Sequence, residues 1–218
     1  MLRAIVKRLL HPALNAYSKW YFSKPRNYRY KDLTVIVNPG VFFPHFTIST
    51  KLLLEYLDDE NLRNRSVLEL GAGTGIISVR CAQNGAEVTA SDISLAAIEN
   101  VKLNANRTGV DVEVIYSDMF DDIPSKFDLV IINPPYYPKN PETEAEKAWF
   151  CGAEFEYFKK LSNQLKSHLS DNGKAIMILS EDCEIELITQ ILKQGGLTIQ
   201  PIKEEKRFGE KNFLFSIN

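Results

Sequence analysis

The residue types best suited to chemistry occur together in a turn that follows an apolar run and begins at Asn133. Pro134 and Pro135 fix φ near about −65° and lack N–H donors, so a strand cannot continue past Asn133. The side-chain amide of Asn133 can both donate and accept hydrogen bonds, and Tyr136 and Tyr137 add two aromatic rings. A stiff turn of this kind suits a planar ligand that carries an amino or amide group.

A second candidate lies upstream, where Glu69 precedes three glycines, Gly71, Gly73 and Gly75, each separated by one residue. Glycines between an apolar strand and a helix let the backbone turn tightly and a ligand approach closely. The dinucleotide fingerprint G-x-G-x-x-G requires a glycine where Ile76 stands, and the lysine of the phosphate loop is absent. The loop therefore has no feature dedicated to phosphate.

Two carboxylates follow the next two predicted strands. Asp92 comes about twenty residues after the glycine loop, where a carboxylate can accept hydrogen bonds from both hydroxyls of a ribose. Asp118 occupies the corresponding place after the next strand, where it can accept from an exocyclic amino group. A nucleoside fits this combination of a glycine loop and two strand-end acids.

The elements that position these residues alternate between strands and helices, which predicts βαβ crossovers and a mainly parallel sheet covered on both faces. The last two strands have no helix between them, so they should form an antiparallel hairpin at one edge. The sequence thus predicts an α/β, doubly wound, seven-stranded sheet. Strands are expected over 66–70, 87–91, 111–116, 127–132, 174–179, 197–203 and 212–217, and helices over 76–84, 95–108, 155–169 and 184–194.

The N-terminal segment 1–31 differs in composition from the rest, because it carries eight basic residues and no Asp or Glu. Apolar residues recur at helical spacing over 2–21, so we expect a basic amphipathic extension before a single domain over 32–218. It could pack on the domain or contact RNA or a membrane surface. Three scattered cysteines and the absence of a long apolar run favour a cytoplasmic protein without a metal site.

From about residue 33 onward the sequence resembles the class I S-adenosylmethionine-dependent methyltransferases. Glu69 to Gly75 is similar to their first motif, Asp92 to the ribose-binding acid, and Asp118 to the acid beside the adenine. The resemblance implies S-adenosylmethionine as cofactor. The cofactor contacts it implies are Glu69, Gly71, Gly73, Thr74, Gly75, Asp92, Ile93, Asp118, Met119 and Asn133.

Asn133-Pro134-Pro135-Tyr136 resembles the signature of the amino-directed methyltransferases, which act on adenine N6, cytosine N4 or a glutamine amide. The resemblance implies that the Asn133 side-chain oxygen and the Pro134 carbonyl accept the two N–H groups of the acceptor. Tyr136 would stack on its planar group. We therefore expect Asn133, Pro134 and Tyr136 to be catalytic.

The loop after this turn resembles the eukaryotic and archaeal branch of the release-factor glutamine methyltransferases, with matches at Glu146, Ala148, Trp149 and Gly152 and a departure at Cys151. The segment around Phe43 is also similar to that family, although His45 stands where it usually has an acid. The substrate contacts implied are Pro135, Tyr137, Trp149, Phe43 and His45.

The sequence thus predicts an N-methyltransferase, with a protein glutamine side chain, in a translation factor for example, as the first candidate acceptor. An RNA or DNA base, at adenine N6 or guanine N2, is the alternative, with segment 1–31 as the nucleic-acid contact. A non-catalytic binding protein is the third hypothesis, and the intact site residues argue against it.

Overall fold

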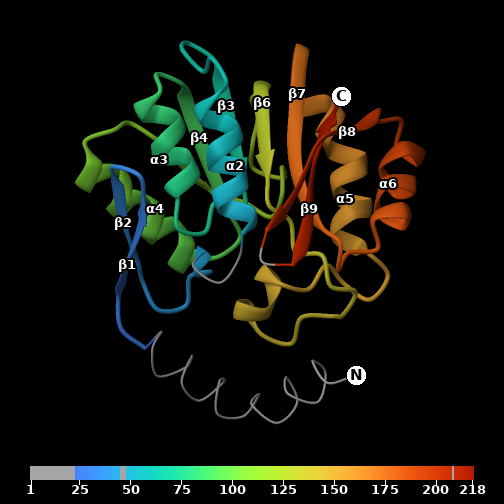
Figure 1. Ribbon diagram of the computed structural model, residues 1–218, viewed down its shortest axis with the longest axis horizontal. Coiled ribbons are helices and arrows are strands. Elements are labelled where there is room, and N and C mark those ends of the chain that lie inside the picture. Colours follow the sequence, from blue (N-terminus) through green and yellow to red (C-terminus); the bar gives the residue numbers. More distant parts are fainter. Residues whose placement is uncertain (1–22, 45–47, 208) are drawn as a thin grey trace.

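The structure is a computed structural model that describes residues 23–44, 48–207 and 209–218. Its centre is a seven-stranded sheet in the order β5-β4-β3-β6-β7-β9-β8 (Figure 1). Five strands run parallel: β3 (Ser66–Leu70), β4 (Glu87–Asp92), β5 (Glu113–Tyr116), β6 (Phe127–Ile132) and β7 (Leu169–Ser180). An antiparallel hairpin, β8 (Ile199–Arg207) and β9 (Glu210–Ile217), completes one edge. The predicted fold class is confirmed.

Helices pack on both faces of the sheet, as Figure 1 shows. The first helix group is α2 (Ser49–Asp58), α3 (Ile76–Gln83) and α4 (Leu95–Thr108), and the second is α5 (Glu156–Gln164) and α6 (Ile185–Gln194). Successive strand residues point to opposite faces, and in β3 Val67 packs with the first group while Leu68 packs with the second. Both faces are therefore buried, as a parallel sheet requires.

A separate two-stranded sheet precedes this body and pairs β1 (Arg26–Tyr30) with β2 (Leu33–Val37). Tyr28 and Tyr30 are buried, and the amide of Asn104 in α4 holds β2 by accepting from Ile36 N and donating to Ile36 O, both at 2.8 Å. The boundary expected between residues 31 and 32 therefore falls in the turn of a hairpin that packs on the domain. The helix expected over 2–21 lies outside the described residues.

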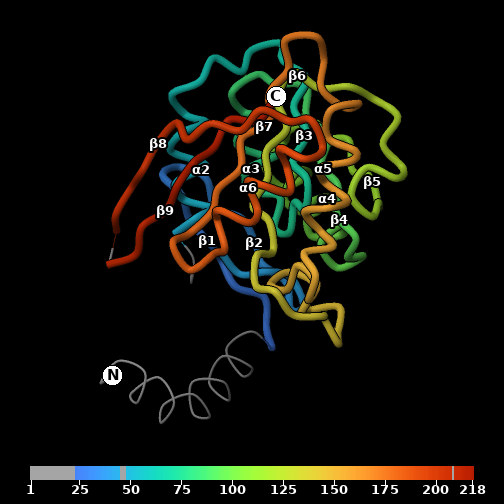
Figure 2. The backbone as a smooth tube through the Cα atoms, turned by 90° about the vertical axis from the view of Figure 1, so that its right-hand side faces the viewer, coloured from blue at the N-terminus to red at the C-terminus, as the bar shows by residue number. Residues whose placement is uncertain are grey.

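The helix expected over 155–169 is shorter in the structure. α5 ends at Gln164, one 3₁₀ turn (Leu165–His168) follows, and Leu169 already belongs to β7, where it pairs with Phe127 of β6. The chain must leave the helix early to reach this pairing, so the prediction from periodicity was wrong at this end. The C-terminal hairpin is longer than expected because the charged stretch before residue 208 continues β8; Figure 2 shows it extending from the body.

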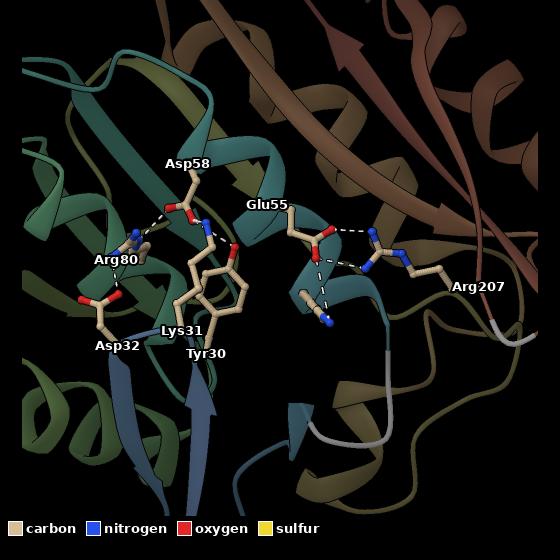
Figure 3. A network of polar contacts seen from close by, with 8 residues as sticks. Tyr30, Lys31, Asp32, Glu55, Asp58, Arg80 and Arg207 are labelled. Atoms are coloured by element: carbon tan, nitrogen blue, oxygen red, sulfur yellow. Dashed lines mark hydrogen bonds and ion pairs between the residues drawn. The ribbon is translucent and has the colours of Figure 1, made fainter.

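Polar contacts fix α2 on both sides (Figure 3). Asp58 accepts from Tyr30 Oη at 3.0 Å, Lys31 Nζ at 2.5 Å and Arg80 Nε at 2.6 Å. Burial alone would raise the pKa of Asp58, but these hydrogen bonds outweigh it and lower the pKa to about 2. On the other side of α2, the guanidinium of Arg207 in β8 donates to both carboxylate oxygens of Glu55, at 3.0 and 2.8 Å. The helix thus ties the β1–β2 hairpin to the C-terminal hairpin.

The strand order reverses between β3 and β6, because the chain moves outward from β3 in one direction through β4 and β5 and then in the other through β6 and β7. Open α/β sheets bind ligands in the crevice outside the carboxyl ends of the strands at such a switch point.

None of the helices within the described ranges is long and apolar enough to cross a membrane.

Candidate active site

A cavity of about 480 Å³ opens at this switch point, a volume within the usual range for small-molecule sites. It is lined by residues that follow β3, β4, β5 and β6 and by one side of α5. The structure brings together here the following residues predicted from the sequence: Gly71, Asp92, Ile93, Asp118, Met119, Asn133, Pro134, Pro135, Tyr136 and Trp149.

A smaller cavity of about 250 Å³ adjoins the first and shares Asp92, Ile93 and Trp149 with it. Gly73 and Phe43 line this second cavity. Three other predicted cofactor residues, Glu69, Thr74 and Gly75, and the predicted substrate residue Tyr137 line neither cavity. His45 lies outside the described residues.

The three glycines of the loop all adopt left-handed backbone conformations, with φ of 76° at Gly71, 51° at Gly73 and 73° at Gly75. Other residues rarely adopt these angles, which explains the glycine at each position. At Gly75 space is also limiting, since a Cβ there would lie 3.0 Å from both methyls of Val101. The loop is held from behind, where Thr74 O accepts from the side-chain amide of Asn104 at 2.9 Å.

Glu69 lies behind the loop and is 5% exposed. Its Oε2 accepts from Ser78 N in the first turn of α3 at 2.7 Å and from the Ser78 hydroxyl. Burial raises the pKa of Glu69 to about 8, against the opposing effect of the Ser78 hydrogen bonds, and nearby Asp92 contributes in the same direction as burial. The side chain is therefore mainly protonated at neutral pH and joins β3 to α3.

Asp92 stands at the end of β4 between the two cavities. Its Oδ2 accepts from Gly73 N at 2.9 Å and its Oδ1 from Ser94 N at 2.8 Å. Burial raises the pKa of this carboxyl, while the backbone hydrogen bonds act in the opposite direction. A carboxylate next to a glycine loop at a strand end is the donor and acceptor set that a ribose requires, so the residues present fit a nucleoside.

Asp118 reaches the same cavity from the turn after β5, and its side chain is 54% exposed. Its Oδ2 lies 2.8 Å from Lys160 Nζ of α5, which also donates to Asp121 Oδ2 at 2.7 Å. Met119, the next residue, has φ of 57°, so the chain bends sharply there. The ion pair with Lys160 thus holds Asp118, the acid that the sequence analysis expects beside the adenine amino group.

The Asn-Pro-Pro-Tyr turn, residues 133–136, also lines the cavity. Among the described residues, none forms a hydrogen bond with the side-chain amide of Asn133 or with the Pro134 carbonyl, so both can accept from a ligand. Tyr136 is half-buried, and its ring centroid lies 4.8 Å from that of Tyr137. Burial and the neighbouring Tyr137 raise the pKa of Tyr136, which keeps its hydroxyl protonated at neutral pH.

The segment that follows the turn folds back beside it and is the gold loop below the sheet in Figure 1. Tyr137 N donates to Trp149 O at 3.1 Å, and Cys151 N donates to Tyr137 O at 3.0 Å. Trp149 is 39% exposed, and its ring lies 5.1 Å from that of Phe42. The loop, which includes the 3₁₀ helix η2 (Glu144–Ala148), therefore places an aromatic side chain at the edge of the cavity.

Sequence reasoning missed the contribution of α5, which lines the cavity with Glu156, Tyr157 and Lys160. Tyr157 and Lys160 are three positions apart and so lie on one side of the helix. That spacing was visible in the sequence, but nothing in it showed which side of the helix would face the strand ends. Ser91 and Ser117, at the ends of β4 and β5, also line the cavity.

Fold and site together define a Rossmann-like α/β protein with a cavity at the carboxyl ends of its parallel strands. A family model described as methyltransferase small domain matches residues 32–208, and the chain belongs to this family.

Two curated relatives of this chain are named for different acceptors. The chain is similar to the release factor glutamine methyltransferase of Lactococcus lactis, with 31% identity over 190 residues, 81% of this chain and 65% of that protein. It is similar also to the ribosomal RNA small subunit methyltransferase C of Haemophilus influenzae, with 37% identity over 147 residues, 66% of this chain and 41% of that protein. The chain therefore spans less than two thirds of the length of either relative.

Among solved structures, the 16S rRNA N2 G1207 methyltransferase of T. thermophilus, in complex with AdoMet and guanosine, has the same fold. The TM-score is 0.66 at 21% identity, over 88% of this chain and 49% of that one.

Proposed function

We propose that this chain is an S-adenosylmethionine-dependent N-methyltransferase whose acceptor is the side-chain amide of a protein glutamine. The observation that carries the proposal is the pairing, within one cavity, of a nucleoside-type site around Asp92 with the unpaired acceptor groups of Asn133 and Pro134. Gly71, Asp92 and Asp118 would hold the cofactor, which when bound supplies an electrophilic methyl group on a sulfonium. A reducing compartment such as the cytoplasm fits the three cysteines, which are all free.

The chain's own contribution is to orient a weak nucleophile. An amide nitrogen reacts poorly because its lone pair is conjugated with the carbonyl group. Hydrogen bonds from its two N–H groups to the Asn133 side-chain oxygen and the Pro134 carbonyl would fix its direction and ease positive charge developing on nitrogen. Tyr136 would pack against the planar amide. Its protonated hydroxyl does not serve as a base, and none is required before transfer because the proton can leave afterwards.

The negative charge near the Asn-Pro-Pro-Tyr turn, which we call the acceptor end of the cavity, supports a protein acceptor over a nucleic acid. Asp182 and Glu210 lie close enough to Tyr137 to contribute, after burial, to the raised pKa of its hydroxyl. Neither carboxylate forms an ion pair with any described residue. Further exposed acids are Glu181 and Glu184 in the β7–α6 connection and Glu186 in the first turn of α6. Nucleic acids bind through basic groups that neutralise phosphates, and these carboxylates would instead repel a phosphate backbone.

A ribosomal RNA base is the second candidate acceptor, because a relative named as a ribosomal RNA methyltransferase matches two thirds of this chain. The basic segment 1–31 could supply the phosphate contacts that the acceptor end lacks. The two candidates differ in what carries the methyl label. Cell extract incubated with labelled S-adenosylmethionine and this protein should contain label that survives RNase and is lost with protease. Label that is lost with RNase would refute the glutamine proposal in favour of RNA.

The role of the turn is tested with Asn133→Ala. The variant should bind S-adenosylmethionine with a dissociation constant within about twofold of wild type and lose methyl transfer by about 100-fold, as expected when a group that contacts the reacting atoms is removed. Calorimetry and the label assay measure the two quantities. Asn106→Ala, at an exposed position of α4, is the matched control. Full transfer activity in Asn133→Ala would refute the assignment.

A further inference from the structure

Helix α5 contributes a basic group, Lys160, to the cavity that the strand-end carboxylates Asp92 and Asp118 also line. Lys160 Nζ lies 2.8 Å from Asp118 Oδ2 and 2.7 Å from Asp121 Oδ2, so one ammonium bridges both carboxylates. Gln164, one turn later, donates to the other oxygen of Asp121 at 2.7 Å. The turn after β5 is thereby fastened to α5 at two points.

Lys160 is only 31% exposed, whereas the side chain of Asp118 is 54% exposed. Apart from Lys160, no described residue forms a hydrogen bond or ion pair with the Asp118 side chain, so its direction depends on this single contact. A half-exposed aspartate without that contact would sample several rotamers. Because Lys160 occupies Oδ2, the second oxygen, Oδ1, remains available as an acceptor at the cavity.

Tyr157, three residues before Lys160, is a second side chain of α5 at this cavity. Its side chain lines the cavity, and the Asp92 carboxylate contributes, after burial, to the raised pKa of its hydroxyl. Lys160 thus contacts Asp118 directly, and Tyr157 lies near enough to Asp92 for its charge to act on the hydroxyl. The helix is a second wall of the nucleoside site.

We infer that Lys160 is a positioning residue for cofactor recognition: it holds Asp118 so that the free oxygen accepts a hydrogen bond from the exocyclic amino group of the adenine. This inference rests on the proposed function, since it assumes an adenine nucleoside in the cavity. Lys160 acts through Asp118, and its consequence is selectivity for a 6-aminopurine over a purine without that group. A lysine that served only to stabilise α5 would affect both ligands equally.

The test compares two ligands, S-adenosylhomocysteine and its analogue with unsubstituted purine in place of adenine, by calorimetry. Wild type should bind the amino compound about tenfold more tightly, the value expected for one hydrogen bond to a charged group. In Lys160→Met this ratio should fall to about threefold or less, with the affinity for the analogue changed by less than about twofold. Lys160→Arg should restore much of the ratio.

Lys159→Met is the matched control, because Lys159 is the exposed neighbour in α5 and its ammonium pairs with no described residue. It should behave as wild type. An unchanged ratio in Lys160→Met, or equal weakening of both ligands, would overturn the inference, and so would a wild-type ratio near one. Failure of wild type to bind either ligand would instead refute the proposed function. Thermal unfolding without ligand confirms that each variant is folded.

Discussion

The buried carboxyl of Glu69 should make the stability of this protein depend on pH in an identifiable way. Its pKa of about 8 in the folded protein lies well above the ordinary 4.5, because burial disfavours the charged form. Between these two values the folded state binds a proton that the unfolded state has released. Raising the pH therefore favours unfolding, and the stabilisation present below about pH 4.5 is lost progressively as the pH approaches 8.

Each pH unit inside this window changes the free energy of unfolding by at most about 1.4 kcal/mol. From pH 5.5 to pH 8.0 the loss from Glu69 alone is thus about 3 kcal/mol. Glu69→Gln keeps an oxygen that can accept from Ser78 N and has no proton to lose, so its stability should lack this component. Titrating groups that do not interact with Glu69 are common to both proteins and cancel in the difference.

The assay is urea unfolding followed by circular dichroism at several pH values between 5.5 and 8.5, for wild type and Glu69→Gln. The difference in unfolding free energy, wild type minus variant, should decrease by about 3 kcal/mol over this range and level off above pH 8. Parallel curves would show that Glu69 is ionised in the folded protein at neutral pH, and would refute its assignment as a neutral link between β3 and α3.

Two further substitutions test how the glycine loop is held. Gly75→Ala should lower the free energy of unfolding by about 3 kcal/mol, because it combines a positive φ with a Cβ only 3.0 Å from Val101. Gly109→Ala is the control: its φ is 68° and the space around it is open, so it should lower the free energy of unfolding by about 1 kcal/mol. Equal losses in urea unfolding would contradict the steric reasoning. Asn104→Ala should cost about 3 kcal/mol by the same measurement, since it removes buried hydrogen bonds to Ile36 and Thr74, and a loss below about 1 kcal/mol would disprove their importance.

The fold could be predicted from the sequence because each strand and helix carries its own pattern. Strand ends were marked by residues that change the chain direction, such as Pro134 after β6 and Gly71 after β3, and both residues line the cavity. Both faces of β3 are buried, as expected for a strand inside a parallel sheet that helices cover on each side. Long-range pairings left weaker marks, which is why the early end of α5 was missed: the pairing of Leu169 with Phe127 is decided by a strand forty residues away.

The site was predictable where a residue follows a strand and not where it lies on a helix. Carboxyl ends of parallel strands converge at one edge, so Asp92, Asp118 and Asn133 could be assigned to one region from their order alone. A helix that packs on a sheet has a buried side and a solvent side, and which of its residues meet the site depends on its rotation. Tyr157 and Lys160 could be recognised only once that rotation was known.

Asp92 shows why position at a strand end does not by itself define a role. Its two oxygens already accept from Gly73 N and Ser94 N, at 2.9 and 2.8 Å, so the carboxylate shapes the glycine loop before any ligand is considered. A ribose would use the remaining lone pairs of the same oxygens, because a carboxylate offers about four acceptor positions. Removing Asp92 would thus disturb the loop and the ribose contact together. Asp92 thus links the glycine loop to the proposed ribose contact. Asp118 is held by Lys160 alone, so it can be replaced without moving the loop.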